Sequence, residues 1–260
     1  MVSSDSTSSS SDPTFSGPDG NMQSAFPAGS TLHSFGAGRL FACAIVAGLL
    51  AGLASVLIGE RILDRYKGDL LPPIENNPSA GNVQRWKDAR VYSATFTFAT
   101  LGGLLGLALG LAGGLATRST FAGVRAAIPG LVVGSAGVGL TSFLLVSVFF
   151  KMRDPQSGDL LVPLLTHGAI WCVAGGIGGL AFGLGLGSWA RCMAASVGGL
   201  AGAVVATVVY ELIGALAFAS SKTDLPLSTS ATTRAMALLL VAALSSIGAA
   251  LAARNTAKPR

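Results

Sequence analysis

Long apolar runs alternate with short polar stretches along most of the chain. Almost uncharged runs of the length that an α-helix needs to cross a hydrocarbon layer, about 20 residues for about 30 Å, recur from residue 39 onward. The pattern predicts six transmembrane helices, at about residues 39–58, 91–116, 126–150, 160–187, 191–219 and 233–253. The expected fold is therefore an all-α integral membrane protein with one transmembrane domain, residues 39–254.

The ends of the chain have a different composition. Residues 1–38 are rich in Ser, Pro, Gly and Asp and contain few aliphatic side chains. Such a segment cannot bury enough apolar surface to offset its ordering entropy, so we predict a disordered tail. Residues 255–260 form a short basic tail. Pro129 and Pro163 fall in the first turns of their predicted helices, where a missing amide proton costs little.

Glycine recurs at every fourth position in two of the predicted helices and more briefly in the first. The glycines are Gly48, Gly52, Gly102, Gly106, Gly110, Gly114, Gly175, Gly179, Gly183 and Gly187. Residues four apart share a helix face, and a face without side chains lets a neighbouring helix approach closely in lipid. The spacing predicts glycine zippers that pack the helices.

The second, fourth and sixth predicted helices end in a common pattern of two small residues and an arginine, each four positions apart. The three endings are Gly110, Gly114, Arg118; Gly183, Gly187, Arg191; and Ser246, Ala250, Arg254. This recurrence predicts three tandem parallel helical hairpins and a pseudo-threefold bundle. The alternative is that glycine-rich and leucine-rich helices resemble one another by composition alone.

Composition and charge agree with a membrane protein. Apolar residues make up 51% of the chain and charged residues 11%, against about 25% in soluble domains. The net charge of +5 comes from basic residues at the edges of apolar segments, which indicates lipid headgroup contact and not nucleic-acid binding. The expected partners are the lipid bilayer and either a second copy of the chain or another membrane protein.

An even number of helices places both termini on one side of the membrane. The connections on that side carry only basic residues, whereas the other side carries more basic residues mixed with acidic ones. A count of basic residues alone would make the second side cytoplasmic. We nevertheless expect cytoplasmic termini, in the inner membrane if the source is bacterial, because the short connections on that side are purely basic and residues 1–38 lack an export signal.

Two ionisable residues lie inside predicted helices and are the candidate polar or transport site. His167 and Glu211 fall in the same half of the bilayer, so they could meet and relay protons or hold a cation. Trp171 lies one turn from His167 and could stack on it. The alternative is that each finds a partner near the membrane boundary, where Trp86, Tyr92 and Tyr210 would form an aromatic belt.

No residue pattern predicts an enzyme, a cofactor site or a metal site. Cys43, Cys172 and Cys192 all fall within predicted helices and are expected to be packing residues. The expected function is therefore that of a structural or accessory membrane protein. The alternative is a small-solute or ion transporter that uses His167 and Glu211.

Overall fold

The computed structural model describes residues 37–70, 80–152, 161–218 and 223–256, and these contain six helices and no strand. The helices are α1 (Ala37–Leu70), α2 (Ala80–Ala116), α3 (Thr120–Met152), α4 (Leu161–Gly185), α5 (Trp189–Ala217) and α6 (Ala231–Asn255). Each is long and apolar enough to cross a membrane, so the prediction of six such helices is confirmed and indicates a multi-pass membrane protein. Residues 1–36 of the predicted disordered tail and residues 257–260 of the predicted basic tail lie outside the described residues, whereas residues 37 and 38 form the start of α1.

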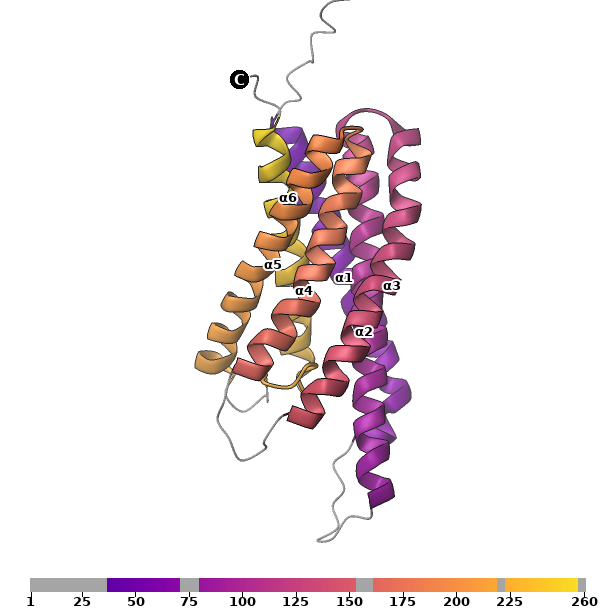
Figure 1. The fold of residues 1–260 in the computed structure, drawn as a ribbon, viewed down its shortest axis with the longest axis vertical. Helices are drawn as coiled ribbons and strands as arrows, with labels where there is room; N and C mark the ends of the chain where they lie inside the picture. Colours follow the sequence, from indigo (N-terminus) through magenta and orange to yellow (C-terminus); the bar gives the residue numbers. More distant parts are fainter. Residues whose placement is uncertain (1–36, 71–79, 153–160, 219–222, 257–260) are drawn as a thin grey trace, which may run out of the picture. The chain divides into compact units, whose positions relative to one another are not determined.

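The first two helices are much longer than their predicted spans. With 34 and 37 residues, α1 and α2 measure about 51 and 55 Å at a rise of about 1.5 Å per residue. Both exceed a hydrocarbon thickness of about 30 Å. They run past α5 and α6 at one end of the bundle, where α1 continues through its charged residues to Leu70 (Figure 1).

The even-numbered helices form the centre of the bundle. Helices α2, α4 and α6 contact one another, while α3 lies against α2 and α4, α5 against α4 and α6, and α1 against α6 and α2. In the apolar windows of α2 and α4, 61% and 56% of the residues are buried, against 28% in α1 and α3. Most of the exposed large apolar side chains lie on the odd-numbered helices α1, α3 and α5.

The glycines of α2 lie directly against the backbone of α3. A Cβ atom added to Gly106 would overlap the carbonyl oxygen of Gly130, and one added to Gly102 would lie 2.5 Å from the carbonyl oxygen of Gly134. Added Cβ atoms on Gly110 and Gly114 would also come within 3 Å of the α3 side of the hairpin. No side chain fits at these positions.

A matching contact joins α4 to α5. A Cβ atom added to Gly179 would overlap the carbonyl oxygen of Ala195. One added to Gly183 would lie 2.6 Å from the backbone nitrogen of Cys192. At Gly175 it would lie 2.8 Å from Ser245 Oγ of α6. The stripe is therefore in contact with α5 along its length and with α6 at one position.

The shorter glycine pair of α1 faces α6. An added Cβ atom on Gly48 would lie 2.8 Å from the carbonyl oxygen of Ala242, and one on Gly52 would lie 3.1 Å from Ala242 Cβ. The first and last helices therefore also meet at small residues. Each helix thus contacts the next one in sequence, and the contact between α1 and α6 closes the bundle.

Gly187 does not belong to the packing stripe, and its assignment to the fourth predicted helix was wrong. Helix α4 ends at Gly185, and an added Cβ atom at Gly187 would meet nothing within 4 Å. Gly187 instead has a φ of 71°, in the left-handed region that glycine adopts without strain just after a helix. Its role is to allow the short turn into α5.

Pro129 also lies elsewhere than predicted, because α3 begins six residues earlier than expected. Ser119 precedes the helix, and its Oγ accepts a hydrogen bond from the backbone amide of Ala122 at 3.2 Å, which places the N-cap there. Pro129 is therefore the tenth residue of α3, inside the helix. Pro163 lies in the first turn of α4, as predicted.

The turn between α4 and α5 provides the first test. Replacing Gly187 by Ala should destabilise the protein by about 1 kcal/mol, because an L-residue in the left-handed region is strained. Gly187→Asn should cost less, since asparagine tolerates that conformation better. Thermal unfolding in detergent measures both, and equal melting temperatures for the alanine variant and the parent protein would contradict the backbone role.

Candidate functional site

The two ionisable residues singled out inside the predicted helices are in contact. His167 of α4 and Glu211 of α5 face each other with 2.7 Å between Nδ1 and Oε1. The exposed fractions of their side chains are 2% and 14%, so the contact lies largely inside the bundle. Sequence reasoning placed both residues in the same half of the membrane, and the packing of α4 against α5 brings them together.

The second nitrogen of the His167 ring faces the backbone. Its Nε2 lies 3.1 Å from the carbonyl oxygen of Leu225 and 3.2 Å from that of Pro226. Carbonyl oxygens only accept hydrogen bonds, so Nε2 carries a proton and donates it. These two carbonyls thereby set which ring nitrogen is protonated in the neutral imidazole.

The proton between His167 and Glu211 leaves the pair electrically neutral. With Nε2 protonated, the 2.7 Å contact needs one further proton, held either by Nδ1 or by the carboxyl group. The pair is then imidazolium with carboxylate, or neutral imidazole with carboxylic acid, and its net charge is zero in both forms. This avoids the large cost of an isolated charge in an apolar interior.

Two aromatic rings enclose the imidazole of His167. Trp171 stacks on it with ring centroids 5.4 Å apart and planes at 26°, as its position one turn along the helix suggested. Tyr210 of α5 meets it edge-on, with centroids 5.6 Å apart and planes at 89°. Tyr210 is only 1% exposed, so its assignment to an interfacial aromatic belt was wrong.

Residues 223–230, which belong to the connection between α5 and α6, are part of the site and were not anticipated. It folds against the end of the bundle, with Leu225 3%, Leu227 8% and Ser228 4% exposed. Its irregular backbone leaves carbonyl groups free to accept hydrogen bonds from His167. The signal that could have revealed it is the apolar Leu-Pro-Leu sequence inside an otherwise polar connection.

Arg234 of α6 holds the same segment from the other side. Its Nε and NH2 groups donate to the two carboxylate oxygens of Glu60 in α1, at 2.8 and 2.7 Å. Its Nη1 atom donates to the carbonyl oxygens of Ser228 and Thr229, at 3.0 and 2.9 Å. The planar guanidinium suits such a two-pronged contact, and it joins α1, α6 and the connection in one network. Arg234 was not singled out by the sequence analysis.

Two spaces of very different size lie on either side of this network. A cavity of about 10 Å³ touches His167, Trp171 and Tyr210, which is room for one water molecule. A crevice of about 460 Å³ lies beside the charged end of α1. Its charged lining residues are Glu60, Asp64, Lys67, Arg90 and Arg234. Leu227, Ser228 and Arg234 line both spaces, so they lie between the crevice and the histidine.

Other candidate chemistry does not gather at this site. Within the described ranges, no three His, Cys, Asp or Glu residues are placed to hold a metal ion. Cys43, Cys172 and Cys192 are free thiols. The site therefore consists of the His167–Glu211 pair, its aromatic neighbours and residues 223–230.

No family model matches the chain, and neither a curated protein nor a solved structure matches it. Fold and site themselves indicate the class: a multi-pass membrane protein with a buried, hydrogen-bonded His–Glu pair near one end of the bundle.

Substitution of Glu211 tests the hydrogen bond to His167. Glu211→Ala should destabilise the protein by about 1–3 kcal/mol, because it leaves the buried Nδ1 atom without a partner. Glu211→Gln should lose much less stability, since the glutamine amide group can donate a hydrogen bond to Nδ1 of His167 while Nε2 keeps its proton. Thermal unfolding in detergent compares the two variants. Equal losses would show that stability does not depend on the hydrogen bond.

Proposed function

We propose that the protein is a structural or accessory membrane protein whose helices are held rigidly by glycine zippers. The observation that carries this proposal is that the glycines of α2 and α4, up to Gly183, lie against the backbone of neighbouring helices. In lipid, where burial of apolar surface does not drive helix association, such close contact is a main source of attraction. A scaffold of this kind needs shape and rigidity and does not need a catalytic group.

The positions of the contacts support an internal repeat. Gly102 corresponds to Gly175 and Gly106 to Gly179, both 73 residues later. Their contacts on the following helix also correspond, because Gly134 and Gly199, and likewise Gly130 and Ala195, are 65 residues apart. The proposed repeat therefore pairs an even-numbered helix with the odd-numbered helix after it, in α2 with α3 and in α4 with α5. Gly48 and Gly52 of α1 against α6 would make the third, closing pair.

These internal contacts bear on how the protein would assemble. Because the stripes are already covered within the chain, assembly with a second copy or with another membrane protein would use the outward surface. That surface consists largely of Leu, Val, Ile and Phe side chains on α1, α3 and α5.

A pair of single-methyl substitutions in α4 tests the packing role. Gly179→Ala should destabilise the protein by about 1–3 kcal/mol, because the new methyl group meets the backbone of α5. Gly176→Ala is the matched control: its new methyl would lie 3.8 Å from the nearest neighbouring atom, and alanine favours a helix more than glycine does. The double variant Gly179→Leu with Gly183→Leu should disrupt folding or assembly. Unchanged melting temperature and oligomer size would overturn the proposal.

The second candidate is an ion or proton transporter centred on His167 and Glu211. The observation that favours it is that Leu227, Ser228 and Arg234 line both the polar crevice and the small cavity that touches His167. Ionisable residues inside a membrane are costly and often functional, and the neutral pair could accept or release a proton through this barrier. A transport cycle would require residues 223–230 to move aside.

Thiol labelling distinguishes the two candidates. Single cysteines at positions 167, 211 and 228 would be placed in a background that lacks Cys43, Cys172 and Cys192, and treated with a reagent that cannot cross the membrane. Ser228→Cys keeps both His167 and Glu211, so it is the reference variant in which the His–Glu pair is intact. The scaffold proposal predicts no labelling at positions 167 and 211, and equal proton flux into proteoliposomes for the parent protein and Glu211→Gln. Labelling of both positions, with flux that Glu211→Gln reduces, would favour the transporter.

A further inference from the structure

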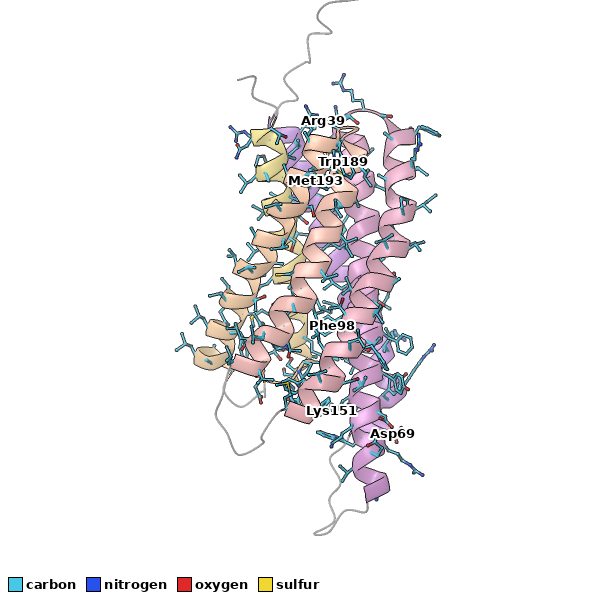
Figure 2. All side chains as sticks on the ribbon, in the orientation of Figure 1. Arg39, Asp69, Phe98, Lys151, Trp189 and Met193 are labelled. Atoms are coloured by element: carbon cyan, nitrogen blue, oxygen red, sulfur yellow. The ribbon has the colours of Figure 1, made fainter. Side chains whose placement is uncertain are left out.

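Charge is distributed unequally between the two ends of the bundle. The end at which α1, α3 and α5 begin carries arginines and no acidic residue among the described positions. The arginines are Arg39, Arg118, Arg125, Arg191 and Arg254. The described acidic residues lie toward the opposite end: Glu60, Asp64, Asp69, Asp88, Glu211 and Asp224. Figure 2 shows Arg39 and Trp189 at the first end and Lys151 and Asp69 at the other. The first end therefore attracts anions.

A groove of about 530 Å³ opens at this arginine-rich end, between the first turns of α3 and the turn that joins α4 to α5. Arg125 and Pro129 line one side, and Ser188 and Trp189 the other. Two aromatic side chains in its lining are largely exposed, Phe121 by 76% and Trp189 by 71%. Exposed aromatic rings beside a cationic group at a helix end are typical of a membrane–water interface.

Arg125 is the charged residue of the groove and is available to a ligand. Its side chain is exposed and makes no hydrogen bond or ion pair with any residue in the described ranges. Arg39 at the same end differs, because its NH2 group donates to the carbonyl oxygen of Leu115. Pro129 has no amide proton, so the carbonyl of Arg125 also lacks its usual partner in the helix, four residues on. The groove thus offers the fork of donors of the Arg125 guanidinium.

We propose that this groove binds one anionic phospholipid, with its phosphate on the Arg125 guanidinium. A guanidinium group matches the geometry of a phosphate by two parallel hydrogen bonds. The acyl chains would continue from the groove along the outward apolar surface, where Leu184 of the groove lining and Ile128 of α3 are 45% and 59% exposed. Charge complementarity selects the anionic headgroup, and the apolar surface selects a lipid over a soluble anion. This inference is independent of the proposed scaffold function.

Native mass spectrometry of the delipidated full-length protein tests the proposal. Titration with phosphatidylglycerol should show a first binding event about tenfold tighter than titration with phosphatidylcholine. Arg125→Gln should abolish that preference and leave the melting temperature unchanged, since the side chain is exposed and without a partner in the described part of the chain. Arg254→Gln, an exposed arginine at the same end but outside the groove, is the matched control and should keep the preference.

Three results would overturn the proposal. Equal binding of the two lipids would remove the charge argument. An equal loss of the preference for phosphatidylglycerol in Arg125→Gln and Arg254→Gln would indicate diffuse attraction by all the arginines at this end. Displacement of phosphatidylglycerol by inorganic phosphate would identify a small-anion site and not a lipid site. Trp189→Ala should weaken the binding of phosphatidylglycerol, and unchanged binding in that variant would contradict the interfacial position of the groove.

Discussion

Contact between the backbones of neighbouring helices is the interaction on which the rest of this structure depends. In a bilayer, lipid tails are as apolar as leucine, so helices gain attraction chiefly where their surfaces fit closely. Helices α2 and α3 achieve this at Gly106 and Gly130, and α4 and α5 at Gly179 and Ala195. These contacts set the spacing of the helices, and that spacing determines which polar side chains can meet.

The polar end of the bundle follows from the same packing together with the cost of buried charge. Because α4 and α5 lie so close, His167 reaches Glu211 across their interface, and the pair shares a proton without a net charge. The free carbonyls of residues 223–230 complete the hydrogen bonds of the imidazole, and Arg234 with Glu60 fixes that segment from the side of α1. Residues 223–230 thus link polar side chains of α1, α4, α5 and α6 at this end of the bundle.

The predictions that proved wrong have two physical causes: local patterns do not mark where a helix begins or ends inside a membrane protein, and they do not show which side chains another element covers. Gly187 continues the four-residue spacing of its helix, yet it provides the left-handed turn after α4. Pro129 was placed in a first turn because its helix was predicted to begin at about residue 126, whereas Ser119 caps the helix earlier. Tyr210 was assigned to the interface, although it packs against His167 of α4, lines a small cavity together with Pro226–Ser228, and is 1% exposed.

The sequence by itself determined that the chain has six helices of membrane-spanning length and the class of protein that this indicates, because hydrophobic length is a local property. It also identified His167, Glu211 and Trp171 as the candidate polar site. Only the tertiary structure decided that His167 and Glu211 touch, that residues 223–230 fold against them, and that Arg234 pairs with Glu60 174 positions away. Those outcomes depend on how helices distant in sequence are placed side by side, and no local pattern encodes that placement.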